Sequence, residues 1–249
     1  MQGGILLFSG FDSETIQFFL DIRFHNETGF MAAHREEYYQ RVRAPFYELI
    51  EALAPCMLQI NPEMEVRPHK CLSRINRDTR FSNDKSPYRD HLWLAFRQSG
   101  ADKQGLPFYW FELGPDSLDW GLGIWGENRE AMNALRKRIL LEPEEIRHLL
   151  NKASYHGFQA GGEAFHRLAL PPEVDERLIP LYRLRRIYLE KQRISFDWAF
   201  EKTLDERLAR DFAALADFYR LLDECVKTGI DQPQAHGRMK TIGGFVEDF

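Results

Sequence analysis

The hydrophobic positions of the chain follow a helical spacing at both ends and a two-residue alternation in the middle. Near the N-terminus, Asp12 is a suitable N-cap for a first helix, and Phe11 is placed to pack onto that helix. We expect the apolar face of this helix at Ile16, Phe19, Leu20 and either Ile22 or Phe24. A second helical stretch is predicted from about Gly29 to Leu53, and Pro45 is expected to kink or split it.

From residue 57 onward the apolar period changes to two, which is typical of strands. Strands are predicted near 57–61, 69–76, 91–97, 107–113 and 117–125. The last two are joined through Pro115-Asp116 and are expected to form an antiparallel hairpin. In the final strand, Gly121 and Gly123 lie on the face opposite the apolar residues, and they leave room for another group to approach closely.

The second half of the chain returns to helical spacing. Helices are predicted near 128–139, 143–152 and 173–192, followed by a long final helix with a capping box in Thr203 and Glu206. The apolar stripe of that last helix is Leu204, Leu208, Phe212, Leu215, Tyr219 and Leu222.

These elements predict an α+β fold, with an antiparallel sheet of about five strands in the middle of the chain and helices on both sides in sequence. We expect a single domain over 1–249. Its parts are a helical segment 1–55, a β-rich segment 56–126, a helical segment 127–228 and a tail 229–249.

Composition excludes several classes of protein. The N-terminus lacks a basic region and a long apolar run, so neither a signal peptide nor a membrane span is indicated, and a cytoplasmic location is expected. Cys56, Cys71 and Cys225 are far apart and form no CxxC pair, which predicts buried thiols instead of disulfides or a zinc ribbon.

Charge is distributed unevenly along the chain. Residues 67–97 contain eight Lys or Arg and three Asp, a net +5, whereas the whole chain carries −5. The remainder therefore carries −10. A positive segment on an acidic body favours a confined site for a small anion and argues against a nucleic-acid surface, which usually spreads its basic charge over a whole face.

The densest part of this segment is RINRDTRFSNDKSPYRDH, residues 74–91, which we call the basic loop. Loops of this length inside compact domains are usually functional or disordered, and this one has apolar residues that can anchor it. Guanidinium groups suit bidentate binding of phosphate or carboxylate, and a lysine adds a point charge. The predicted ligand-binding residues are Arg74, Arg77, Arg80, Ser82, Lys85 and Tyr88.

Two alternatives compete with ligand binding at the basic loop. In the first alternative, the protein is an enzyme that acts on phosphoesters or acyl phosphates, with Asp78 or Asp84 as a base or metal ligand and the arginines stabilising negative charge. In the other alternative, the nearly matched Arg and Asp residues form a structural ion-pair network in a scaffold or interaction protein.

The segment RDTRFSNDKSPYRDH resembles the signature of an uncharacterised bacterial family, domain of unknown function 2461. Further similarity is carried by HNETGFMAAHREEYYQRVRAPF, by YWFELG with WGLGIW, and by LYRLRRIYLEK. The resemblance covers most of the chain. Because the family has no assigned activity, the resemblance does not indicate which reaction or cofactor to expect. The loop positions that match the family pattern are Arg74, Arg77, Asp78, Arg80, Phe81, Ser82, Asp84, Lys85, Pro87 and Tyr88.

Other chemistries lack their motifs. The chain has no P-loop, HExxH or GxSxG, and GLGIWG has no accompanying βαβ unit with a following acidic residue. A metal site would require His69 and His91 to face each other across strands with Glu112 or Asp119 as further ligands, and ordinary structural histidines are the preferred interpretation. No metal or cofactor is therefore assigned.

Overall fold

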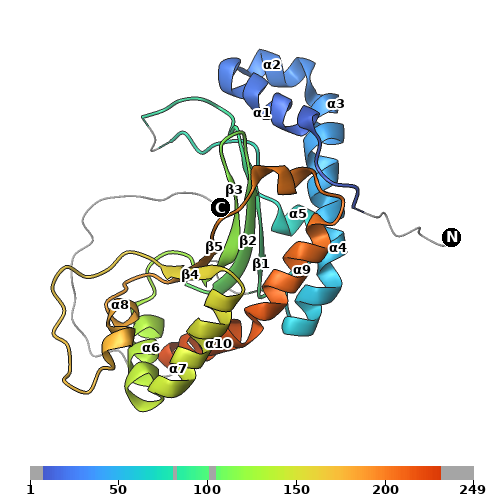
Figure 1. Cartoon of the computed structure of the whole chain (residues 1–249). Helices are drawn as coiled ribbons and strands as arrows, with labels where there is room; N and C mark the ends of the chain where they lie inside the picture. The colour runs from blue at the N-terminus through green and yellow to red at the C-terminus, as the bar shows by residue number, and fades with distance from the viewer. Residues whose placement is uncertain (1–7, 81–82, 101–104, 231–249) are drawn as a thin grey trace.

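A five-stranded antiparallel sheet is the centre of the fold, and its order is β1-β2-β3-β5-β4. The computed structural model describes residues 8–80, 83–100 and 105–230. In Figure 1, α4, α9 and α10 lie along one side of the sheet. The predicted α+β fold is confirmed. The strands are β1 (Leu92–Arg97), β2 (Pro107–Leu113), β3 (Leu118–Ile124), β4 (Phe158–Gly161) and β5 (Tyr188–Lys191).

Three of the predicted strands are confirmed and two are wrong. The stretch 57–61 continues α4 (Ala44–Ile60), because Met57 and Ile60 extend the helical stripe that begins at Phe46. The stretch 69–76 begins with the short helix α5 (Pro68–Cys71) and then contacts β1 through a single bridge between Leu72 and Leu94.

The other two strands, β4 and β5, come from the half that was predicted to be helical. In place of a helix over 173–192 there is a 3₁₀ turn (Glu176–Leu178), the short helix α8 (Ile179–Tyr182) and then β5. Arg136 explains where α8 ends, because its guanidinium donates to the backbone oxygens of Tyr182 (2.9 Å) and Leu184 (2.6 Å). These two carbonyl oxygens thus accept hydrogen bonds from a side chain, and not from the backbone N–H groups of a continuing helix.

The N-terminal helices follow the prediction with local changes. Asp12 caps α1 (Ser13–Phe24) by accepting from the backbone N–H of Thr15 at 2.9 Å. The predicted face of α1 is confirmed at Phe19 and Ile22, which are buried. It is wrong at Phe24, which is 76% exposed, and it missed Thr15, which is buried and whose hydroxyl donates to the Arg41 oxygen at 2.6 Å. The buried positions of α1 are Thr15, Phe18, Phe19 and Ile22.

The break expected at Pro45 takes the form of a π-helical segment. After α2 (Thr28–Ala33) and α3 (Arg35–Glu37), residues Tyr38–Arg43 are π-helical, and α4 follows at once. Pro45 lies in the first turn of α4, where its missing N–H does the least harm.

The C-terminal helices cover the core face of the sheet. α6 (Arg129–Leu141) and α7 (Pro143–Tyr155) are as predicted, but the last predicted helix is two helices that meet at Leu215, α9 (Leu204–Ala214) and α10 (Ala216–Ile230). A further 3₁₀ turn, Phe196–Phe200, precedes them. The predicted capping box is wrong, because Thr203 is at the N-cap but its side chain makes no capping bond.

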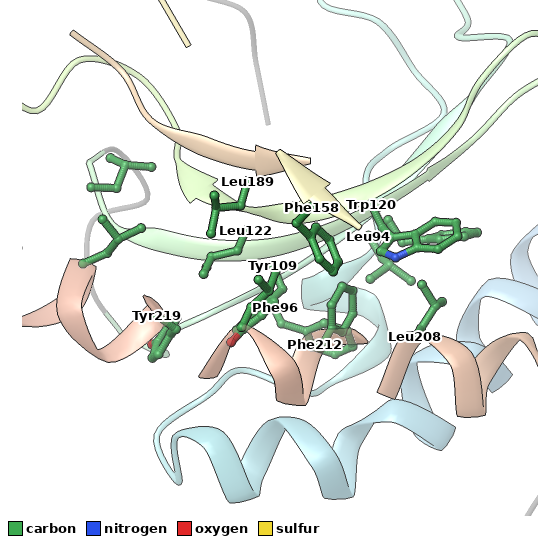
Figure 2. Packing of buried hydrophobic residues seen from close by; sticks show 14 of the residues in the cluster. Leu94, Phe96, Tyr109, Trp120, Leu122, Phe158, Leu189, Leu208, Phe212 and Tyr219 are labelled. Carbon is green, nitrogen blue, oxygen red and sulfur yellow. The ribbon is translucent and has the colours of Figure 1, made fainter. Parts of the chain in front are cut away.

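The core lies between the sheet and α9 and α10. Figure 2 shows Tyr109, Trp120 and Leu122 of the sheet directed toward Phe212 and Tyr219 of these helices. The rings of Tyr109 and Tyr219 stack with centroids 5.5 Å apart. All six residues of the predicted stripe from Leu204 to Leu222 are buried, so that prediction is confirmed.

One charged group lies in this core. Asp211 of α9 accepts from Trp120 Nε1 at 2.9 Å and from Lys191 Nζ at 3.0 Å. Lys191 also donates to the backbone oxygen of His156 at 2.7 Å. Side-chain exposure is 7% for Asp211 and 13% for Lys191, so this ion pair is largely removed from water and connects α9 to β3 and β5.

Candidate functional site

A short antiparallel ladder closes the basic loop at its base. Asn76 and Tyr88 form a β-bridge, the Arg77 N–H donates to the Pro87 oxygen at 2.9 Å, and the Arg89 N–H donates to the Ile75 oxygen at 2.8 Å. The described residues between these arms, 78–80 and 83–86, project from the end of the sheet, as the trace above β3 in Figure 1 shows.

Asn26 fixes this ladder to the N-terminal helices. Its Nδ2 donates to the Tyr88 oxygen and its Oδ1 accepts from the Tyr88 N–H, both at 3.0 Å. The side-chain amide thus satisfies both backbone groups of one residue, as a neighbouring strand would. The ring of Tyr88 is only 8% exposed and belongs to the hydrophobic core.

Replacing Asn26 with alanine is expected to lower the free energy of unfolding by about 1–2 kcal/mol, since two hydrogen bonds to a buried stretch of backbone are lost. Hydrogen exchange at the Tyr88 amide should become faster by a larger factor than exchange in β2. Asn151→Ala, at an exposed position of α7, is the matched control. Unchanged protection of the Tyr88 amide would show that the ladder does not need this anchor.

Each aspartate between the arms of the loop pairs with an arginine. Asp78 accepts from Arg80 Nε through both carboxylate oxygens, at 2.9 and 2.8 Å, and Asp84 pairs with Arg77. Both aspartates also order the backbone, because Asp78 accepts from the Arg80 N–H and Asp84 accepts from the Ser86 N–H, each at 2.9 Å. These ion pairs are the feature on which the structural alternative depends.

The remaining predicted ligand-binding residues are arranged differently. Arg74 is exposed, and no carboxylate within the described residues forms an ion pair with it. Lys85 is exposed and its Nζ donates to the Thr79 oxygen at 2.7 Å. Tyr88 lies in the core as described above, and Ser82 and Phe81 lie outside the described residues.

The two predicted acid candidates, Asp78 and Asp84, have different surroundings. Hydrogen bonds from Ser86 and from Arg77 lower the pKa of Asp84 to about 2. A carboxylate with so low a pKa is ionised at neutral pH and is a weak general base. Asp78 is mostly covered, and its two oxygens are occupied by Arg80.

The third aspartate, Asp90, is bound outside the loop. Arg23 of α1 donates to Asp90 and to Asp116, each at 2.6 Å, and His91 Nδ1 lies 3.0 Å from Asp90. Burial alone would raise the pKa of Asp90, but the hydrogen bonds from His91 and Arg23 outweigh it and lower that pKa. Asp90 therefore does not neutralise the arginines of the loop.

A second group of polar and aromatic side chains lies on the face of the sheet opposite the core. Strand register aligns Trp93, Glu112 and Asp119 in one row across β1, β2 and β3, and aligns Trp110 with Gly121 in the next. We call this the polar face. Its principal side chains are Trp93, Trp110, Glu112, Asp119, Tyr188 and Glu190.

Asp119 is the most perturbed acid of the polar face. Burial, with a contribution from the charge of Glu112, raises its pKa from 3.8 to about 6, although the hydrogen bond from Trp110 Nε1 (2.7 Å) opposes the shift. His91 lies on the same side, whereas His69 is in α5 and not on a facing strand. Within the described residues, no group of three or more His, Cys, Asp or Glu could hold a metal ion.

The glycines of β3 are covered by an aromatic ring and a neighbouring strand. A Cβ added at Gly121 would lie 2.5 Å from Cη2 and 2.7 Å from Cζ2 of Trp110, so the indole lies against the backbone there. At Gly123 a Cβ would meet the Tyr188 Cβ at 2.8 Å. The close approach predicted at these glycines is confirmed, and the approaching groups belong to the chain itself.

Sequence inspection did not identify the polar face as a site. The alternation in YWFELG and SLDWGLG placed Trp110, Glu112 and Asp119 on one side of each strand. That signal was present, but the contribution of Glu190 depends on β5, which was predicted to be helical.

The model of one protein family, described as conserved hypothetical protein (DUF2461), matches residues 14–221. The chain belongs to this family. The matched region contains both the basic loop and the polar face. A comparison with curated proteins found no match. Among the described residues, no helix has the length and apolar character required to cross a membrane.

Proposed function

We propose that this member of the family binds a small anionic ligand, one that carries phosphate or carboxylate, at the basic loop. The observation that carries the proposal is the charge left after pairing. From 74 to 89 the chain has five Lys or Arg and two Asp. Each Asp is bound to one Arg, while Arg74 and Lys85 form no ion pair with a carboxylate in the described part of the chain.

The paired arginines also favour anion binding. A guanidinium has five N–H donors, and Asp78 accepts from the Nε and Nη2 groups of Arg80. The side chain of Arg80 is still 74% exposed. A guanidinium oriented by a carboxylate loses less conformational entropy when it binds an anion than a mobile one does.

We further propose a cytoplasmic location for this activity. Cys56, Cys71 and Cys225 are all free thiols, and two of them are buried. Unpaired cysteines are usual in reducing compartments, where phosphorylated metabolites are also abundant, so the cysteines support this location.

Titration calorimetry with inorganic phosphate, citrate and a nucleotide panel tests the anion site. At least one anion should bind, and the double variant Arg74→Ala/Lys85→Ala should weaken it tenfold or more, because two unneutralised charges are removed. Arg183→Ala/Lys202→Ala removes two exposed cations elsewhere and should leave affinity unchanged. Equal losses in the two double variants, or no binding by any anion, would refute the proposal.

The ion pairs favour one competing role, that of a structural network. In that case Asp78→Asn and Asp84→Asn would lower thermal stability, and no anion would raise the melting temperature of the unmodified protein. If the protein is instead an enzyme on phosphoesters or acyl phosphates, Asp78→Asn would abolish turnover and leave anion binding intact. The low pKa of Asp84 makes it the weaker candidate base.

A further inference from the structure

The indole of Trp110 is a flat surface within the polar face. Its six-membered ring lies against Gly121, where a Cβ would be 2.5 Å from the nearest ring atom. Trp110 is half-buried, so part of it is accessible to solvent. Because one side of the ring rests near the backbone, the ring has a fixed position.

Acidic groups lie along the edge of this indole that carries Nε1. Asp119 accepts from Nε1 at 2.7 Å, and Glu190 of β5 is the register partner of Gly121, over which the adjoining Cζ2 and Cη2 atoms of the ring lie. The two carboxylates are close enough for the charge of Asp119 to raise the pKa of Glu190, in addition to the effect of burial. Glu112, directly opposite Asp119 on β2, is a third acid beside the ring.

Aromatic groups complete the border of the ring. Tyr188 stands nearly perpendicular to Trp110, with centroids 6.4 Å apart and an interplanar angle of 86°, and it is 40% exposed. Phe108, which shares the register partner Gly123 with Tyr188, is tilted against Trp110 with ring centroids 5.7 Å apart. The aromatic side chains thus come from the cross-strand row on one side of Trp110. The carboxylates come from the row of Trp110 itself and from the row on its other side.

This arrangement selects for positive charge. The face of an indole is negative and attracts cations within about 6 Å of the ring centroid. A hydrogen bond from Nε1 to a carboxylate makes the ring more electron-rich, and nearby carboxylates add their own attraction. The polar face already contains one such contact, since the Arg89 guanidinium lies 4.6 Å from the centroid of Trp93.

We propose that the polar face binds an organic cation, an alkylated ammonium group, over the indole of Trp110 beside Asp119 and Glu190. An alkylated ammonium is weakly hydrated and lacks most or all N–H donors, so it gains from aromatic contact and from charge without requiring directed hydrogen bonds. Charge complementarity decides the class of ligand, because three carboxylates around the ring repel an anion. The site is thus separate from the anion site of the basic loop.

Choline and its neutral carbon isostere, 3,3-dimethylbutan-1-ol, test the proposal directly. They have nearly the same shape, so a difference in affinity measures the effect of the charge. Choline should bind saturably in calorimetry and change tryptophan fluorescence, while the alcohol should bind at least tenfold more weakly. Equal affinity for both compounds, or no saturation by choline, would overturn the proposal.

Conservative variants identify the residues responsible. Glu190→Gln preserves shape and should weaken choline at least fivefold, and Trp110→Leu should abolish binding. Glu173→Gln, an exposed acid outside the sheet, should have no effect. Thermal melts establish that each variant is folded, and because Glu190 is half-buried at the surface of the sheet, the Glu190→Gln variant is informative even if Trp110→Leu unfolds.

The outcomes are distinct from those of the anion site. Arg74→Ala/Lys85→Ala should leave choline affinity unchanged, so either site can fail alone. If Glu190→Gln binds choline as tightly as the unmodified protein, the cation site is not on the polar face. If a neutral sugar such as xylose displaces choline and binds more tightly, the face is a polyol site and the proposal is wrong.

Discussion

Replacing Asp211 with alanine is expected to lower the free energy of unfolding by about 4 kcal/mol, because removal of one partner leaves a buried charge uncompensated. Among the described residues, the Lys191 ammonium would keep only the His156 oxygen as a hydrogen-bond partner, and the Trp120 N–H would lose its acceptor in the core. Urea denaturation at pH 7 measures the loss.

Two comparisons sharpen this expectation. Glu206→Ala, an exposed acid on the same helix, should change stability by about 0.5 kcal/mol. The double variant Asp211→Leu/Lys191→Met should recover much of the loss, since replacement of a buried ion pair by apolar groups is often close to neutral. A loss below about 1 kcal/mol in Asp211→Ala would show that water reaches this pair.

Asp119→Asn is expected to stabilise the protein at pH 8 by up to about 3 kcal/mol, given a pKa shift of about two units. The folded-state pKa is about 6 and the ordinary value is 3.8. Above pH 6 both states are ionised, and the folded state bears the unfavourable burial of the charge. As the pH falls from 6 toward 3.8 the folded carboxyl takes up its proton first, so this penalty disappears.

The gain from Asp119→Asn should therefore shrink between pH 6 and pH 4 and vanish below that range. An asparagine oxygen can still accept from Trp110 Nε1, so the indole keeps its partner. Thermal unfolding from pH 4 to pH 8 measures the effect, with Asp197→Asn at an exposed position as the control. A gain that is equal at every pH would show that packing, and not the charge, is responsible.

Local signals in the sequence correctly predicted those features that depend on residues close together in the chain. The cap at Asp12, the stripe from Leu204 to Leu222 and the β2–β3 hairpin each follow from spacing within one short segment. The four-residue strands β4 and β5 are too short to show a period, and α8 ends where Arg136, 46 residues away from Tyr182, binds the carbonyls. Such contacts are decided by tertiary structure.

For the candidate sites too, the sequence indicates some features, and others depend on tertiary structure. The positive charge of the basic loop is evident from composition, but the pairing of Arg77 with Asp84 and of Arg80 with Asp78 depends on how the loop turns. On the polar face, the glycines of β3 indicated a close approach. Only the register between strands identifies the indole of Trp110 as the group that lies over Gly121.

The strand order has a consequence for biosynthesis. β1, β2 and β3 are consecutive in the chain and adjacent in the sheet. The other neighbour of β3 is β5, which begins 64 residues after the end of β3 (124 to 188). During translation the β3 edge is therefore exposed while more than sixty further residues are made. An unpaired edge of this kind invites association with other chains. A nascent chain arrested before Tyr188 should thus depend on chaperones more strongly than one released after Lys191.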